Sequence, residues 1–216
     1  MSLRICEIFK SIQGESTFAG RPCVFVRLVG CNLRCAWCDT AYSHEGGEDL
    51  SAEAVLARID ALGGGLPHML VEFTGGEPLL QPEAVALANR LARDGRTVLV
   101  ETNGSLDISA LHPDVAAIVD MKGPSSGESA KMDTENLERL RARDEVKFVI
   151  ADRLDWERML CLLPRIDARR NPVNLSPVPG ILAAADLARW MLDADLDARL
   201  NLQLHKHIWP AEARGV

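Results

Sequence analysis

Short β-branched runs alternate with helical patterns along most of this chain, and that alternation constrains the fold more than any other feature. The runs occupy residues 23–29, 68–73, 97–101, 116–121, 145–150, 172–178 and 200–205. Ser51 is a suitable N-cap for a helix over residues 52–62, and Pro82 suits the first turn of a helix that Gly95 ends. Residues 181–194 also carry apolar residues at helical spacing. Buried strands separated by helices predict a parallel sheet covered by helices.

Polar and glycine-rich segments follow the carboxyl ends of these runs. Three cysteines follow the first run, and the other segments are "TGGEP", "TNG", "KGPSSG" and "KHIW". In a TIM-like barrel these strand ends form one face, which carries the active site. A chain of 216 residues is short for eight complete βα units. We therefore expect a partial, incomplete TIM-like βα barrel, formed as a single domain over residues 1–216.

Composition narrows the setting of the protein. Hydrophobic residues make up 47% of the chain, charged residues 25%, and the net charge is −7 without a Lys/Arg run. This balance predicts no nucleic-acid partner. The N-terminus lacks the apolar stretch of a signal peptide, and no membrane span is expected. We expect a cytoplasmic protein with reduced thiols, in which Cys6, Cys23 and Cys161 are core residues because they lack ligand-like spacing.

Cys31, Cys35 and Cys38 form a CxxxCxxC motif, which is one ligand short of a closed tetrahedral site. Thiolates of cysteine hold iron–sulfur clusters, and a cubane held by three of them leaves one iron open to bind another ligand. A zinc site of the Cys3His type, completed by His44, is the alternative that spacing leaves open.

Two motifs resemble those of the radical S-adenosylmethionine (SAM) superfamily. "CNLRCAWCDT" resembles its CxxxCxΦC signature, with Trp37 in the aromatic position, and "TGGEP" resembles its GGE motif. The resemblance implies a 4Fe–4S cluster whose open iron chelates the amino and carboxylate groups of SAM. Reduction of the cluster would then release a 5′-deoxyadenosyl radical. An electron donor such as a flavodoxin is the partner that this chemistry implies.

Further segments are similar to the 7-carboxy-7-deazaguanine synthase family within that superfamily. They span the chain and read "EIFKSIQGES", "AGRPCVFVRLVGCNLRC", "WCDT", "TGGEPLLQ", "VETNGS", "DMKGPSSG" and "LQLHKHIW". The family implies a ring contraction of 6-carboxy-5,6,7,8-tetrahydropterin to 7-carboxy-7-deazaguanine. Ammonia is lost, magnesium assists, and the product enters the biosynthesis of queuosine and other 7-deazapurines. It also implies a homodimer.

The same resemblance implies the residues that bind the pterin substrate. These are Ile12, Gln13, Gly14, Glu15, Arg27, Thr74 and His205. Arg27 is unusual because it lies in an otherwise apolar strand. Its planar guanidinium would suit the pterin carboxylate, and a structural ion pair with an acidic residue is the alternative.

Family resemblance also supplies the cofactor and metal contacts. The residues expected around SAM are Trp37, Cys38, Asp39, Gly76, Asp120, Met121, Lys122, Ser176, Pro177, Val178 and Pro179. Glu77 would hold its loop, and the Thr40 hydroxyl would bind Mg²⁺, with a loop-capping role as the alternative. No side chain is assigned a catalytic role from the sequence.

Two other functions are compatible with parts of the sequence. A glycyl-radical enzyme activase shares the cysteine motif and a short chain, and its large protein substrate would require a wide groove. A zinc-stabilised binding module would use the cysteines without catalysis. Some family members place their terminal carboxylate at the active site; here "PAEARGV" (210–216) continues past that point, which puts this contact in doubt.

Overall fold

A single mixed sheet forms the centre of the computed structural model, which describes residues 2–210 and 213–215. The strand order is β3-β1-β2-β4-β5-β6-β7-β8-β9, with β1 antiparallel to both β2 and β3 and the remaining neighbours parallel. The strands are β1 (Ser2–Ile12), β2 (Pro22–Leu28), β3 (Glu48–Ser51), β4 (Leu70–Gly75), β5 (Thr97–Thr102), β6 (Ala116–Asp120), β7 (Glu145–Ile150), β8 (Val173–Pro177) and β9 (Arg199–Leu200). The helices are α1 (Ala52–Ala61), α2 (Pro82–Arg93), α3 (Asn136–Arg139), α4 (Arg153–Leu162), α5 (Ala184–Asp193) and α6 (His205–Ile208).

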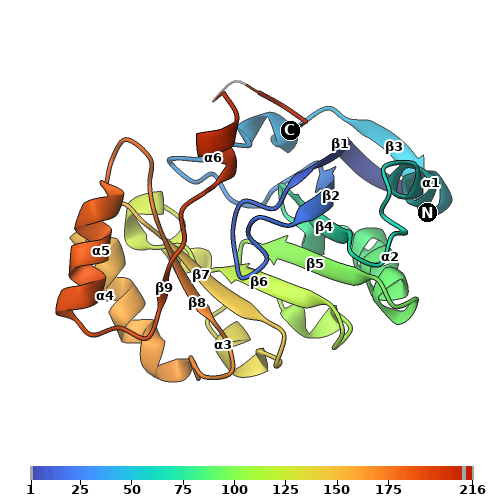
Figure 1. The fold of residues 1–216 in the computed structure, drawn as a ribbon. Helices are drawn as coiled ribbons and strands as arrows, with labels where there is room; N and C mark the ends of the chain where they lie inside the picture. The colour runs from blue at the N-terminus through green and yellow to red at the C-terminus, as the bar shows by residue number, and fades with distance from the viewer. Residues whose placement is uncertain (1, 211–212, 216) are drawn as a thin grey trace.

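The predicted partial barrel is confirmed. The sheet curves, with α1, α2, α4 and α5 along its outer side and α6 near the opening at the top of Figure 1. Within the described part of the chain, β3 and β9 are the two edges and do not pair with each other, so the barrel stays open. In this same part of the chain, no helix has the length and apolar character that a membrane span requires.

Local sequence signals explain where the helices begin. The Ser51 hydroxyl accepts a hydrogen bond from the Ala54 amide at 3.1 Å and starts α1 as expected. Pro82 occupies the first turn of α2, and Gly95 follows that helix with φ +84°, a backbone conformation that favours glycine. Helix α4, which was not specified from the sequence, begins at an Asp152 cap that accepts from the Leu154 amide at 2.9 Å.

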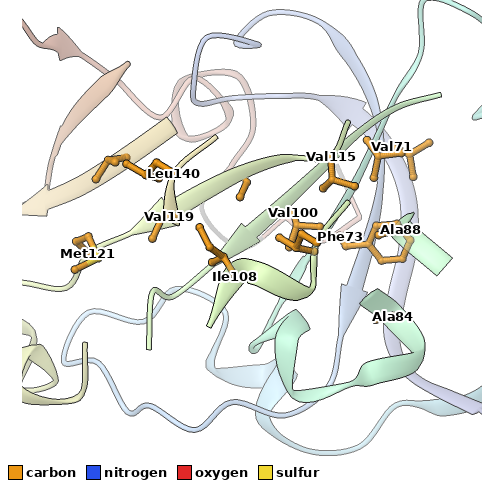
Figure 2. Packing of buried hydrophobic residues seen from close by; sticks show 14 of the residues in the cluster. Val71, Phe73, Ala84, Ala88, Val100, Ile108, Val115, Val119, Met121 and Leu140 are labelled. Atoms are coloured by element: carbon orange, nitrogen blue, oxygen red, sulfur yellow. The ribbon is translucent and has the colours of Figure 1, made fainter. Parts of the chain in front are cut away.

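Successive side chains of each strand point to opposite faces of the sheet, and the two faces bury different residues. The outer face packs against the helices in one large core, which includes Val71, Phe73 and Ala88 (Figure 2). The inner face holds a smaller apolar layer made of Cys23, Leu70, Leu99, Ala116 and Ile118. This inner layer closes the barrel beneath the strand ends that carry the polar loops.

The expected strands agree with the structure to within a few residues, except for the last one. The run at residues 200–205 was predicted as a strand, but β9 ends at Leu200 and α6 begins at His205. The chain leaves the sheet because the Leu204 amide donates to the Gly14 carbonyl at 2.9 Å instead of to β8. Of residues 210–216, residues 211, 212 and 216 lie outside the described part.

Further differences from expectation concern β1, β3 and α5. β1 and β3 were not expected, and β3 exists because its polar sequence pairs with the start of β1. α5 begins at Ala184, three positions later than expected, because the Val178 carbonyl accepts the amides of Ile181 and Leu182 in a preceding turn.

Candidate active site

A cavity of about 370 Å³ opens at the carboxyl ends of the parallel strands. Its walls come from the loops after β2, β4, β5 and β6, from the β1–β2 turn and from the segment that enters α6. The predicted site residues that line it are Ile12, Gln13, Gly14, Glu15, Arg27, Cys31, Cys35, Trp37, Cys38, Asp39, Thr40, Thr74, Gly76, Asp120, Lys122, Val178, Pro179 and His205. The expectation that strand-end segments meet at one face is therefore confirmed.

Three residues expected around SAM do not line this cavity. Met121 is 1% exposed and lies in the outer core with Val119 and Leu140 (Figure 2). Ser176 is buried, and its hydroxyl donates to the Asn201 carbonyl at 2.7 Å. Pro177 is also absent from the wall. The alternation of inward and outward side chains explains Met121, because the inward position before it belongs to Asp120.

The loop that carries the three cysteines is held by the loops around it. Gly30 has φ +96°, and its carbonyl accepts the Glu77 amide at 2.7 Å. The Arg34 amide donates to Glu128 Oε1 at 2.7 Å, and the Ala36 amide donates to the Ser126 carbonyl at 3.0 Å. Segments after β4 and β6 therefore position a loop that has no regular structure of its own.

The thiols of Cys31, Cys35 and Cys38 are half-buried and line the same cavity. The Leu33 amide donates to the Cys31 sulfur at 3.4 Å, and Asn103 Nδ2 donates to it at 3.7 Å. Burial raises the pKa of Cys35, and the Lys122 ammonium opposes that effect. The donor set fits a cluster that takes cysteine thiolates and leaves one position facing the cavity.

The zinc alternative finds less support in this geometry. Cys38 Sγ lies 3.9 Å from His44 Nε2. Across residues 2–210 and 213–215, however, no three His, Cys, Asp or Glu side chains converge closely enough to hold a single metal ion. The described side chains are therefore not arranged as a tetrahedral single-ion site.

The GGE segment holds the cavity wall in place. Glu77 is fully buried and accepts hydrogen bonds from Thr102 Oγ1 at 2.8 Å and from the Asn103 amide at 2.7 Å. A side chain at Gly76 would overlap the Gly30 carbonyl, so glycine is required there by packing against the cysteine loop. The predicted structural role of Glu77 is thus supported, and contact between Gly76 and SAM stays a prediction.

The β1–β2 turn forms another part of the cavity wall. Gln13 Oε1 accepts the Glu15 amide at 2.5 Å, and Gln203 Nε2 donates to Glu15 Oε1 at 2.5 Å. A Cβ at Gly14 would overlap the ring of His205, so the absence of a side chain lets that imidazole reach the cavity. Burial lowers the pKa of His205, which favours a neutral ring that can donate or accept.

Arg27 forms the structural ion pair considered from the sequence, and its contact with the pterin carboxylate stays a prediction. Its Nε donates to Glu7 Oε1 at 2.7 Å, and the Tyr42 hydroxyl donates to the same oxygen at 2.8 Å. Among the described residues, the terminal nitrogens of Arg27 make no hydrogen bond, and the side chain lines the cavity. The ion pair with Glu7 therefore orients a guanidinium whose terminal nitrogens can still receive a ligand carboxylate.

The two residues that follow the last cysteine, Asp39 and Thr40, also line the cavity. Asp39 Oδ2 pairs with Lys206 Nζ at 2.8 Å, which ties the cysteine loop to α6 (Figure 1). The Thr40 hydroxyl lies 3.8 Å from the Cys38 sulfur and does not cap the short helix that begins at Ala41. The capping alternative for Thr40 is thus not supported in this structure.

Comparison with known proteins places the chain in a family. The Radical SAM superfamily model matches residues 25–122. The 7-carboxy-7-deazaguanine synthase of Koribacter versatilis is 43% identical, with 99% of this chain and 100% of that protein aligned. The corresponding synthase of Chlorobaculum tepidum is 41% identical over 99% of this chain and 97% of its own.

This chain belongs to the 7-carboxy-7-deazaguanine synthase family. The crystal structure of QueE from Escherichia coli is similar, with a TM-score of 0.77 and 26% identity over 94% of each chain. SuiB from Streptococcus suis, at 14% identity and a TM-score of 0.54, shares the fold. Membership of the radical SAM superfamily implies a 4Fe–4S cluster and SAM, and these relatives do not favour the glycyl-radical activase alternative.

Sequence reasoning missed a layer of charged side chains inside the barrel. Glu72, Glu101 and Lys147 lie at inward positions of β4, β5 and β7, and all three line the cavity beside Asp120. Lys147 Nζ lies 2.8 Å from Glu101 Oε1 and also pairs with Glu15. A single charge inside an apolar run singled out Arg27, and the same signal was present in these three strands.

Proposed function

We propose that the protein is a radical SAM enzyme that contracts the ring of 6-carboxy-5,6,7,8-tetrahydropterin. The product is 7-carboxy-7-deazaguanine, with ammonia lost, and it supplies queuosine and other 7-deazapurines. One observation carries the proposal: the cysteine loop, the β1–β2 turn and Arg27 line the same cavity of about 370 Å³. That volume suits a cofactor and a small heterocycle rather than a protein substrate.

One side of the cavity would bind the cofactors, and the other would bind the substrate. On the cofactor side, Cys31, Cys35 and Cys38 would hold the cluster, and Trp37 with Lys122 would border SAM. When bound, the reduced cluster and SAM supply the radical that removes the hydrogen from C6 of the pterin. The protein positions that carbon and keeps water away from it.

On the substrate side, charge and shape match a carboxylated pterin. Glu15 lines the cavity and is held by its ion pair with Lys147, so its carboxyl oxygens are acceptors for the guanidine-like edge of the pterin. Arg27 would bind the carboxylate through its terminal nitrogens. Thr74 and His205 also line the cavity and would complete the polar contacts.

We further propose that Thr40 ligates Mg²⁺ together with substrate oxygens and water. Support comes from a hydroxyl that faces the cavity without capping the helix after it. Mg²⁺ keeps several waters and needs few protein ligands. Thr40→Val should retain the brown cluster and SAM binding, but it should lose the stimulation of turnover by Mg²⁺, whereas Thr40→Ser should retain most of it. A valine variant that still responds to Mg²⁺ would place the metal elsewhere.

The remaining expectations concern the protein's context. We propose a single radical SAM domain that works as a cytoplasmic homodimer and receives electrons from a donor such as a flavodoxin. The family resemblance supports these assignments. Sedimentation of the purified protein tests the dimer, and reduction of the cluster by flavodoxin tests the donor.

A product assay tests the proposed reaction. The protein is purified anaerobically, reconstituted with iron and sulfide, and supplied with SAM, reductant and the carboxy-tetrahydropterin. We expect the deazaguanine chromophore, its mass, and equimolar ammonia. Cys35→Ala should lose all three together with the brown colour, whereas Cys161→Ala, which changes an exposed thiol, should keep them. Cleavage of SAM without a deazaguanine product would refute the assignment.

A further inference from the structure

Six ionisable side chains converge on the floor of the cavity, and their charges do not balance. Four carboxyl groups and two ammonium groups line it: Glu15, Glu72, Glu101, Asp120, Lys122 and Lys147. Asp120 Oδ1 is buried and has no hydrogen-bond partner among residues 2–210 and 213–215, so this floor has acceptor capacity left for a ligand. With all six groups ionised, the floor would carry two uncompensated negative charges in a region shielded from water, which is costly.

The two ammonium groups form ion pairs with three of the four carboxyl groups. Lys147 pairs with Glu15 and Glu101, and Lys122 Nζ lies 2.7 Å from Asp120 Oδ2. Among the described residues, neither ammonium forms an ion pair with Glu72. Glu72 is therefore the carboxyl group that the cations leave uncompensated.

Burial and two neighbouring carboxyl groups favour the neutral form of Glu72, and the hydrogen bond from Gln13 and the charge of Lys147 oppose them. Glu72 is 1% exposed, and the side-chain hydrogen bond it receives comes from the neutral Gln13 amide. Glu101 faces it from β5 and Glu15 from the β1–β2 turn, the neutral thiol of Cys23 lies beside it on β2, and Lys147 on β7 opposes them. Burial, and then the charge of Glu101, raise the pKa of Glu72 well above its ordinary value.

The pKa of Glu101, on the neighbouring strand β5, shifts in the opposite direction. Burial is the largest single influence and opposes its ionisation, but the charge and hydrogen bond of Lys147, together with the charge of Lys122, lower the pKa of Glu101. Two adjacent carboxyl groups whose environments push their protonation apart form the arrangement that enzymes use for an acid and its ionised partner.

We propose that Glu72 is a protonated carboxyl group that acts as the general acid for the loss of ammonia. This inference rests on the proposed function. The C–N bond of the rearranging substrate breaks with its electron pair moving to nitrogen, and the Glu72 O–H proton moves to that nitrogen. Ammonia leaves and Glu72 becomes a carboxylate. The proton that the carbon skeleton gives up as the new ring becomes aromatic returns to Glu72, which restores the acid.

Glu72→Gln tests this role, with Glu145→Gln as a matched control. Glu145 is also a buried glutamate, 2% exposed, but it accepts from Thr17 and Asn174 near the closed end of the barrel and does not line the cavity. Glu72→Gln should still cleave SAM in response to substrate, whereas ammonia release should slow on the order of 10²–10⁴-fold. Glu72→Asp should recover part of that rate, and Glu145→Gln should release ammonia at the wild-type rate.

The pH profile and infrared spectroscopy separate an acid from a structural residue. Wild-type ammonia release should decline at alkaline pH as the acid ionises, and Glu72→Gln should lose this limb. The carbonyl band of a protonated carboxyl should be present at neutral pH in the wild type and in Glu145→Gln, and absent in Glu72→Gln.

The two proposals fail in different ways. Wild-type ammonia release by Glu72→Gln with an unchanged pH profile, or a carboxyl band that survives in it, would overturn the role of Glu72. A wild-type protein that forms no deazaguanine would instead overturn the proposed function. If Glu72→Gln does not fold, the wild-type band and its loss on alkaline titration, together with the rate of Glu72→Asp, give the same decision.

Discussion

Two layers inside the barrel lie on the same strands and differ completely in chemistry. Leu70, Leu99 and Ile118 belong to the apolar layer, and two residues further along each strand stand Glu72, Glu101 and Asp120. Because side chains alternate across a strand, these pairs share the inward face. The lower, apolar layer excludes water by packing alone. The upper layer, made of Glu72, Glu101 and Asp120, places charged side chains on the surface that lines the cavity. Position along the strand thus separates the part of the barrel that stabilises the fold from the part that meets ligands.

The largest loss of unfolding free energy should follow a substitution of Lys147, whose ammonium pairs with Glu101 of the upper layer. Lys147→Met removes the cation between Glu15 and Glu101 and leaves buried carboxylates unpaired, which should cost about 3–5 kcal/mol of unfolding free energy at neutral pH. Lys147 lowers the pKa of Glu101 against the effect of burial, so the stability it provides is present above the ordinary carboxyl pKa and lost as pH falls. Urea unfolding should show the gap between variant and wild type narrowing on acidification. A gap that does not change with pH would contradict this.

The matching change in the lower layer should be insensitive to pH. Leu99→Ala leaves a cavity in a fully buried apolar layer and should cost about 3 kcal/mol. The same urea experiment at acidic and neutral pH measures it. Equal pH dependence for Leu99→Ala and Lys147→Met would remove the distinction between the layers.

Substitutions of Arg27 should affect binding of the pterin more than folding. Arg27→Ala should weaken pterin binding by about 2–3 kcal/mol, because a charge-assisted carboxylate contact is lost. Arg27→Lys should recover only part, since an ammonium cannot reproduce the planar fork. Calorimetry with the pterin and with SAM measures both, and SAM affinity should not change. Normal pterin binding by Arg27→Ala would reduce this arginine to the ion partner of Glu7.

The smallest expected effect is the change in thermal stability of the Glu72→Gln variant. Burial raises the pKa of this group, so its folded state takes up a proton, and wild-type stability is lost as pH rises through the raised pKa. Glu72→Gln carries no such proton. Its Tm should therefore rise relative to wild type over the pH window that begins at the ordinary carboxyl pKa and ends at the raised pKa of Glu72. A Tm difference that stays constant over that window would show that Glu72 is already ionised.

The sequence predicted features whose signal is local. The cysteine spacing and the GGE segment could be recognised because each is contained in a few residues, and Ser51 and Pro82 carry their own capping chemistry. The charged layer could not be assembled in this way, since the pairing of Lys147 with Glu15 depends on how distant strands close into a barrel. A sequence shows that a strand contains a charge, but not which counter-charge faces it.

Errors in the predicted elements have the same origin. Residues 200–205 have a strand-like alternation, yet Leu204 finds its backbone partner in Gly14 rather than in the sheet. β3 has no apolar pattern and is a strand only because β1 offers it an edge. Cys161 was expected in the core but is exposed, and Cys6 is half-buried, so of the cysteines outside the motif only Cys23 is a core residue. In each case, tertiary partners decide what local sequence leaves open.

The central claim is that one cavity holds SAM beside the C6 position of a carboxylated pterin. The most direct measurement supplies substrate deuterated at C6 and follows the isotope into 5′-deoxyadenosine by mass spectrometry. We predict that deuterium appears in 5′-deoxyadenosine, that its appearance requires Cys31, Cys35 and Cys38, and that deazaguanine accumulates with it. Formation of 5′-deoxyadenosine at the same rate with and without substrate, and free of deuterium, would contradict the account.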